Sequence, residues 1–160
     1  MQSRLSELST LDLLHRASQI AENAFERRIG SKLALTARQY AILRAVATNE
    51  GLSQTAIVEA TGIDRSTVAE MVRRMVERGW LQRRRVRDDS RTYAVRLTSS
   101  GKQALSAAEP ASRQTEEAVL SAIRSVRRDQ FRAALIELIV AAEKVEDGAR
   151  RSANRRPKKR

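Results

Sequence analysis

The chain has 160 residues and a formal net charge of +12 at pH 7, with one histidine and no cysteine. That length suits a single domain with its own apolar core, and the lack of cysteine excludes disulfides, thiol redox sensing and cysteine zinc sites. His15 alone cannot form a metal centre. No apolar run is long enough to cross a bilayer and no secretory leader is recognisable, so we expect a cytoplasmic protein without membrane contact, metal or cofactor.

The positive charge is concentrated in two segments, residues 64–96 and 150–160. The first carries twice as many basic as acidic side chains, and the second carries no acidic side chain. Basic clusters of this kind are typical of surfaces that bind the phosphates of a nucleic acid. For the terminal segment taken alone, a solvated basic tail is an equal alternative.

The first expected helix begins after Ser9, which forms a capping pattern with Asp12, and ends near Ile29. Apolar residues recur along it at helical spacing, which predicts one buried face. The residues of this face are Leu11, Leu14, Ala17, Ala21, Ala24 and Phe25. We expect a loop over residues 30–35.

A second helix is predicted after Thr36, because Thr36 and Gln39 form a capping box. Tyr40, Leu43 and Val46 are its inward-facing residues, and residues 48–51 close it. Tyr40 is interpreted first as a core residue and second as a ligand contact.

Residues 51–98 carry the pattern of a helix-turn-helix followed by a hairpin. Ser53 caps a short helix, and residues 61–63 form a turn around a glycine. Asp64 then caps a second helix by accepting from the N–H groups of Ser66 or Thr67. Together these elements predict two short helices joined by a tight turn.

The second of these helices has one apolar stripe, at Val68, Val72, Met75 and Val76. The opposite face is polar and basic, and it comprises Arg65, Ser66, Thr67, Glu70, Arg73 and Arg74. Gly79 ends the helix in a left-handed conformation. Strands are predicted over residues 81–86 and 92–97, separated by a polar break at residues 87–90.

This arrangement predicts DNA binding, because the major groove of B-form DNA admits one α-helix. Arg65, Ser66 and Thr67 are placed to reach bases and phosphates, and Gln54 and Thr55 to touch the backbone. Arg73 and Arg74 are interpreted as phosphate anchors. Glu70 either accepts from a cytosine amine or orients these two arginines, and we favour the second role.

Several spaced motifs resemble the MarR family of winged helix-turn-helix repressors. They are Asp64-Arg65-Ser66-Thr67-Val68, Gly79-Trp80-Leu81, Asp89-Ser90-Arg91, Leu97-Thr98 and Gly101. The resemblance implies a homodimer on a pseudo-palindromic operator, released when a small molecule binds between the dimer helices and the DNA-binding lobe. It also implies that Arg91 reaches the minor groove and that Asp89 holds it, while neighbouring wing arginines add positive field.

The expected fold is therefore mainly α with a small two-stranded β wing, a winged helix-turn-helix between N- and C-terminal dimerisation helices. The expected DNA-binding residues are Gln54, Thr55, Arg65, Ser66, Thr67, Arg73, Arg74, Arg85, Arg87, Asp89 and Arg91. We expect dimerisation segments over residues 1–35 and 99–146, the DNA-binding lobe over 36–98 and a basic disordered tail over 147–160.

The effector side is inferred from two segments, residues 13–19 and 35–39, which resemble those of family members that control aromatic-acid breakdown. Some of these members respond to hydroxycinnamoyl-CoA thioesters, so the implied effector is an aromatic acid or an aryl-CoA thioester. Guanidinium groups suit both carboxylate and phosphate. The candidate ligand residues are His15, Arg16, Gln19, Asn23, Arg38 and Tyr40. Surface charges or dimer salt bridges are the equal alternative.

The C-terminal part predicts a long helix after Leu97-Thr98, with a kink or a break near Glu109 because Pro110 removes a backbone donor. Residues 127–129 are expected as a junction. The last helix then has a heptad-like stripe, at Phe131, Leu135, Leu138, Ala142 and Val145. We expect this stripe to pair across a two-fold axis, the alternative being packing within one chain.

The leading hypothesis is thus a ligand-responsive transcriptional repressor. The alternatives are an architectural or nonspecific DNA-binding protein without an effector, and a winged helix used for protein contacts. The sequence shows no nucleophile and base pair, no glycine-rich phosphate loop and no metal cluster. We therefore do not expect an enzyme.

Overall fold

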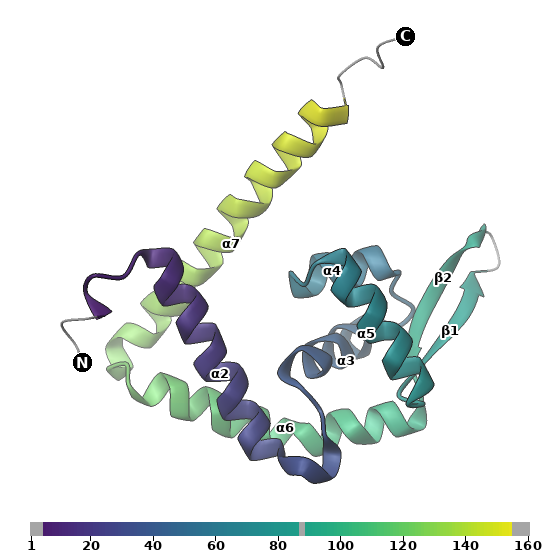
Figure 1. The fold of residues 1–160 in the computed structure, drawn as a ribbon, viewed down its shortest axis with the longest axis horizontal. Coiled ribbons are helices and arrows are strands. Elements are labelled where there is room, and N and C mark those ends of the chain that lie inside the picture. The colour runs from purple at the N-terminus through teal and green to yellow at the C-terminus, as the bar shows by residue number, and fades with distance from the viewer. Residues whose placement is uncertain (1–4, 87–88, 155–160) are drawn as a thin grey trace. The chain divides into compact units, whose positions relative to one another are not determined.

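The computed structural model describes residues 5–86 and 89–154. The chain divides into two compact units, with bounds Met1–Glu117 and Ala118–Arg160. Figure 1 shows its helices and its one hairpin. The elements are α2 (Thr10–Leu33), α3 (Ala37–Thr48), α4 (Gln54–Thr61), α5 (Arg65–Glu77), β1 (Leu81–Val86), β2 (Asp89–Leu97), α6 (Ser99–Ser121) and α7 (Ser125–Asn154). The mainly α fold with a two-stranded wing is confirmed. No helix of the described residues combines the length and apolarity needed to cross a membrane.

Four helices start at the residues that the sequence predicts. Ser9 and Asp12 form a reciprocal capping box on α2, and Thr36 and Gln39 form one on α3. The Ser53 hydroxyl accepts from the backbone N–H of Ala56, at 3.1 Å, to cap α4. Each cap satisfies a donor that the first helical turn leaves without a partner, so these starts depend on residues within one turn.

The end of α2 differs from the expected loop over residues 30–35. Gly30 interrupts the helix with φ 70°, yet a helical turn follows and extends to Leu33, before Ala34 ends it with φ 44°. The Arg78 guanidinium donates to the carbonyl oxygens of Leu33 and Ala34, at 2.7 and 3.0 Å. A contact across more than forty residues therefore stabilises this turn, which is why local sequence did not reveal it.

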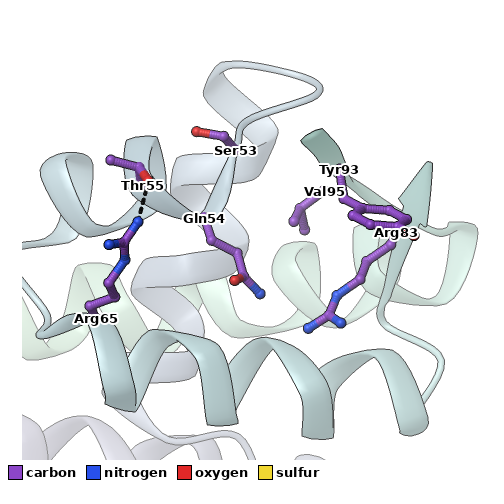
Figure 2. Close-up of a pocket in the computed structure, with 7 residues that line it drawn as sticks. All are labelled: Ser53, Gln54, Thr55, Arg65, Arg83, Tyr93 and Val95. Atoms are coloured by element: carbon purple, nitrogen blue, oxygen red, sulfur yellow. Dashed lines mark hydrogen bonds between the residues drawn. The ribbon is translucent and has the colours of Figure 1, made fainter. Parts of the chain in front are cut away.

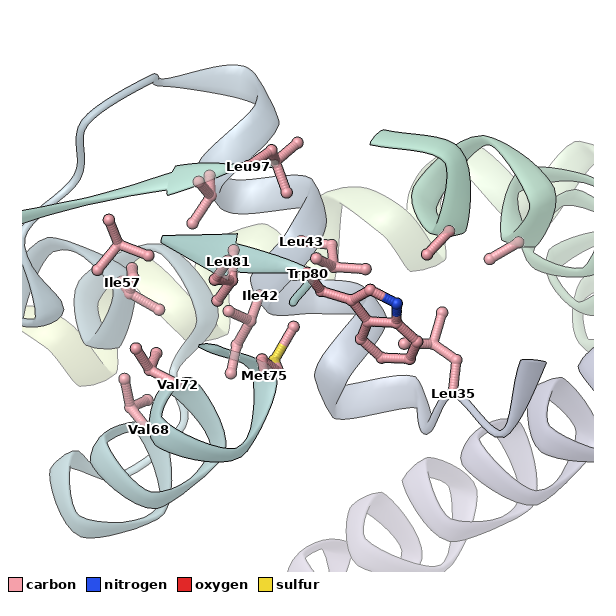
Figure 3. Packing of buried hydrophobic residues seen from close by; sticks show 14 of the residues in the cluster. Leu35, Ile42, Leu43, Ile57, Val68, Val72, Met75, Trp80, Leu81 and Leu97 are labelled. Atoms are coloured by element: carbon pink, nitrogen blue, oxygen red, sulfur yellow. The ribbon is translucent and has the colours of Figure 1, made fainter. Parts of the chain in front are cut away.

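The core lies between α3, α4, α5, α6 and the hairpin. Figure 3 shows Val68, Val72 and Met75 of α5 among its side chains, and all three have zero exposure. The cluster also contains Phe25, Leu35, Ile42, Leu43, Val46, Ile57, Trp80, Leu81, Val95, Leu97 and three alanines of α6. Each fully buried aliphatic side chain contributes about 2 kcal/mol, more than an exposed ion pair at roughly 0.5 kcal/mol. Apolar burial therefore positions α5.

The hairpin pairs β1 and β2 antiparallel, from Leu81 opposite Leu97 to Val86 opposite Asp89. The register shifts between Arg85, which lies opposite Tyr93, and Val86, which lies opposite Asp89. Asp89 and Ser90 were expected in the break between strands, but they belong to β2. The prediction that they form a break was wrong because the strands stay paired beyond the register shift, with Val86 opposite Asp89. Figure 1 shows the hairpin extending beside α5.

Helix α6 runs without interruption from Ser99 to Ser121, so no break occurs at Glu109. Pro110 removes one backbone bond, but Ala104, Ala108 and Ala111 are buried on one face and hold the helix to the core. The predicted break is therefore wrong, because tertiary packing outweighs one missing hydrogen bond, and the kink stays a prediction.

Two further boundaries differ in the second unit. The junction between the last helices lies at residues 122–124, because α7 already begins at Ser125 and includes residues 127–129. Arginine favours helices, so a cluster of charges is no helix breaker. Helix α7 also continues to Asn154, so residues 147–154 are helical and not disordered as expected. They contain no proline, and the rest of the expected tail, 155–160, lies outside the described residues.

Candidate nucleic-acid interface

The start of α5 is held by Asp64, whose carboxylate oxygen Oδ1 accepts from the Thr67 N–H at 2.9 Å and the Ser66 hydroxyl at 2.6 Å. The Ser66 and Thr67 hydroxyls and the Thr67 N–H hold the pKa of the Asp64 carboxyl well below its ordinary range. Asp64 is therefore ionised at neutral pH. Because the Ser66 hydroxyl already donates to this carboxylate, it can meet DNA as an acceptor while the cap is intact.

Arg65 joins the start of α5 to the start of α4. Its Nη2 donates to the Thr55 hydroxyl at 3.1 Å, and both residues are exposed. Figure 2 shows this bond at one side of a cleft and Arg83 of β1 at the other, with Gln54 between them. The cleft has a volume of about 340 Å³ and is lined by Ser53, Gln54, Thr55, Arg65, Arg83, Tyr93 and Val95.

This cleft is suited to a phosphate group. The first N–H groups of α4 lie beside Ser53, and helix N-termini attract anions through these donors and the helix dipole. Arg65 and Arg83 add two guanidinium groups from separate elements. The cleft therefore brings together Gln54, Thr55 and Arg65 from the expected DNA-binding set.

Sequence reasoning did not include Ser53, Arg83, Tyr93 and Val95 among these residues. The hairpin register places Arg83, Tyr93 and Val95 on one face of the sheet, since Arg83 pairs with Val95 and Arg85 with Tyr93. Residues two apart on a strand share a face of the sheet, so strand alternation groups these side chains, but only the packing of the hairpin brings them beside Gln54 of α4. The side chains of Arg85, Asp89 and Arg91 are outside what the structure describes, and Arg87 lies outside the described residues altogether.

The middle of α5 carries a network of charges. Glu70 accepts from Arg73 through Nε at 2.9 Å and Nη2 at 2.7 Å, and from Arg74 through Nε at 2.6 Å. Arg73 also donates to Glu77. Hydrogen bonds from Arg73, and then from Arg74, lower the pKa of Glu70 to about 2. Glu70, followed by Glu77, raises the pKa of Arg73.

A second concave region lies between α2, α3 and the turn that joins α4 to α5. Its volume is about 530 Å³, within the usual range for a small-molecule site, and it is lined by Ser18, Glu22, Ala37, Arg38, Ala41, Thr61, Gly62, Ile63 and Asp64. Arg38 is the one member of the expected ligand set that lines it. Its Nε lies 3.4 Å from Glu22 Oε1.

The other expected ligand residues are placed elsewhere. His15, Arg16 and Asn23 are exposed on α2. Gln19 donates to Glu22 at 3.4 Å, and the half-buried Tyr40 packs on Phe25 with ring centroids 5.2 Å apart. The preferred interpretation of Tyr40 as a packing residue thus agrees with this contact. Within the described part of the chain, no group of three His, Cys, Asp or Glu side chains is placed to hold a metal ion.

Comparison with known proteins agrees with this geometry. The model of the MarR family matches residues 35–92. The transcriptional regulator HosA of Escherichia coli is 36% identical over 97 residues, which cover 61% of this chain and 72% of HosA. The chain belongs to the MarR family. A putative transcriptional regulatory protein for the hcr operon of Thauera aromatica is 35% identical to this MarR-family chain over 98 residues, 61% of it and 59% of the relative.

Solved structures of MarR-family regulators have the same fold. BpsR of Bordetella bronchiseptica, whose DNA binding is regulated by 6-hydroxynicotinic acid, superposes with a TM-score of 0.75 at 27% identity, over 81% of this chain and 92% of BpsR. PcaV of Streptomyces coelicolor, solved with its natural ligand, gives 0.73 at 28%, over 81% and 91%. A mutant MarR of E. coli bound to operator DNA shares the fold alone, with a TM-score of 0.73 at 18%, over 79% and 91%. The protein is thus a transcription regulator with a DNA-binding winged helix, and not an enzyme.

Two residues of the MarR-family motif have structural roles at the base of the wing. The Thr98 hydroxyl accepts from the Gly101 N–H at 3.0 Å and donates to the Gly79 carbonyl. A Cβ on Gly101 would overlap the carbonyl oxygen of Trp80. Glycine is therefore required at residue 101 for the close approach of α6 to the segment that follows α5.

Proposed function

We propose that this protein is a ligand-responsive repressor, which binds a pseudo-palindromic operator as a homodimer and leaves it when a small aromatic effector binds. The observation that carries the proposal is the cleft at the starts of α4 and α5, where Arg65 and Arg83 face a capped helix N-terminus. In this proposal the start of α5 contacts bases, and the cleft takes a phosphate of the backbone.

The homodimer is supported by apolar side chains that the single chain leaves in solvent. On α7, Phe131, Leu138 and Val145 are exposed, and on α2 so are Leu11 and Ile20. Exposed apolar stripes of this length usually mark an interface between chains. We propose that segments 1–35 and 99–146 supply this interface and that segment 36–98 forms the DNA-binding lobe.

The effector response is supported by the concave region beside Arg38. Arg38 and Glu22 line this region, and so does Asp64, which caps α5. An effector carboxylate would compete with Glu22 for the Arg38 guanidinium and would adjoin the turn before α5. DNA binding by BpsR is regulated by 6-hydroxynicotinic acid, which supports an aromatic acid as the effector class we propose. An aryl-CoA thioester stays the alternative, from the resemblance of residues 13–19 and 35–39.

A gel-shift titration with DNA from upstream of the protein's own gene tests the proposal. The titration is repeated with 6-hydroxynicotinic acid, p-coumarate and p-coumaroyl-CoA, with random duplex of equal length as control. We expect tight binding to the upstream DNA, relieved by one of these compounds. Equal affinity for upstream and random DNA, unchanged by every compound, would instead support an effector-independent architectural protein. The net charge of +12 is the observation that favours this alternative.

Two variants separate the DNA site from the effector site. Arg65→Ala should weaken operator binding by about 1 to 3 kcal/mol, whereas Arg27→Ala, an equal loss of charge at an exposed residue of α2, should change it far less. Arg38→Ala should keep operator binding and lose the relief by effector. Equal effects of Arg65→Ala and Arg27→Ala would discard the cleft as the DNA site.

A further inference from the structure

The exposed face of α5 presents two arginines that are both held by one carboxylate. Glu70 accepts two hydrogen bonds from Arg73, at 2.7 and 2.9 Å, and a third from Arg74, at 2.6 Å. Glu77 binds the remaining side of the Arg73 guanidinium. The two cations and two anions together make a neutral patch in the middle of a helix that lies in an otherwise basic segment.

The start of the same helix is organised differently. Arg65 donates to the neutral hydroxyl of Thr55, so its positive charge is not cancelled by that contact. Among the described residues Arg65, at the start of α5, forms no ion pair, whereas Arg73 and Arg74, more than two turns later, are paired with carboxylates. This difference matters because binding to random DNA depends almost entirely on cations that meet phosphates.

We propose that Glu70 is a specificity-determining residue, which withholds Arg73 and Arg74 from the phosphates of random DNA. This inference rests on the proposed function. If Arg73 and Arg74 both exchange Glu70 for phosphates, they leave an unpaired carboxylate close to the DNA, where like charges repel. The cost falls on every complex that relies on phosphate contacts.

Random and operator DNA differ in how much they would gain from free arginines. On random DNA the protein can shift until both guanidinium groups meet phosphates. On the operator, base contacts at the start of α5 determine the register, so Arg73 and Arg74 reach phosphates only where that register places them. A carboxylate in the major groove is also tolerated only opposite a base amine, such as N4 of cytosine. Removing the Glu70 carboxylate should therefore raise the affinity for random DNA more than the affinity for the operator.

The test compares full-length wild type with Glu70→Gln on upstream DNA and on a random duplex, each over a series of salt concentrations. For the random duplex we expect roughly tenfold tighter binding at low salt and a plot of log affinity against log salt that is steeper by about 0.9 for each arginine released. The preference for upstream over random DNA should fall several-fold. Circular dichroism verifies that the variant is folded.

Two further variants separate charge from geometry. Glu26→Gln removes the same charge from an exposed residue of α2 and should leave the slope and the preference unchanged. Glu70→Asp keeps the charge but shortens its reach, so both quantities should lie between wild type and Glu70→Gln.

The outcomes are distinct. The role of Glu70 would be overturned if Glu70→Gln had the salt slope of wild type, or if its affinity rose equally on both duplexes. In either case the proposed function would still stand, provided that wild type prefers upstream DNA. If wild type itself shows no preference, the proposed function fails, and the specificity role fails with it.

Discussion

Helices α5 and α7 are both amphipathic, but they use their apolar stripes differently. Val68, Val72 and Met75 of α5 have no exposure, whereas Phe131 and Leu138 of α7 are 41% and 47% exposed. The stripe of α5 is buried in the apolar cluster of its own chain, whereas in the single chain the stripe of α7 has no equivalent cover. The comparison teaches that the same periodic pattern can specify a core or a face left exposed in the single chain, which for α7 we propose as an interface.

The largest effect is expected at the base of the lobe that holds α5. Gly101→Ala should lower the free energy of unfolding by about 3 kcal/mol, because the new Cβ would overlap the Trp80 carbonyl oxygen. In an ordinary helix the same change would stabilise by roughly 1 kcal/mol. Urea denaturation measures the difference. Ser100→Ala, at the exposed neighbour, is the control, and equal midpoints for the two variants would refute the close approach.

The next effect separates the two stripes directly. Val72→Ala should cost about 2 kcal/mol of unfolding free energy, because it leaves a cavity in the core. Leu138→Ser should change the stability of dilute protein by less than about 0.5 kcal/mol, since the residue is exposed, but should weaken self-association. Urea titrations and sedimentation equilibrium measure both properties. A Leu138→Ser variant that self-associates like wild type would break the comparison.

The smallest effect concerns the cap of α5 and depends on pH. The pKa of Asp64 is lowered when the chain folds, from an ordinary value of 3.8, because Ser66 and Thr67 donate to it. A lowered pKa means that its stabilisation is complete above about pH 4 and declines as pH falls toward the folded value. Wild type should thus melt a few degrees above Asp64→Asn at pH 7, with a smaller gap at pH 3.

Melting curves at pH 7, 4.5 and 3 measure this gap. Asp129→Asn, the same change at an exposed residue of α7, is the control and should show no comparable gap at pH 7. A gap between wild type and Asp64→Asn that widens on acidification would contradict the proposed cap.

Much of the fold could be predicted because its signals are local. The caps at Ser9, Thr36, Ser53 and Asp64 each involve residues within three positions, and the glycine turn at Gly62 has the expected positive φ. The failures have another origin. The continuous α6 depends on buried alanines, and the helical turn before Ala34 depends on Arg78.

The candidate sites divide in the same way. The polar face of α5 follows from helical period, so Arg65, Ser66 and Thr67 could be named in advance. Arg83 and Tyr93 of the cleft could not, because their place beside Gln54 depends on how the hairpin packs against α4. The pairing of Glu70 with Arg73 and Arg74 is an intermediate case. Their spacing of three and four residues permits the pairing, but the side-chain rotamers in the structure decide whether it forms.

By itself, the sequence determined the starts of α2, α3, α4 and α5, the stripe of α5, the presence of two strands and the family, because each depends on neighbours within a turn, on a repeated spacing or on spaced motifs. Only the tertiary structure decided which side chains share a cavity. Arg38 and Asp64 line one concave region although 26 positions separate them, and His15 does not join them. Such proximity depends on where α2, α3 and the turn before α5 meet in space, which is a property of packing and not of local sequence.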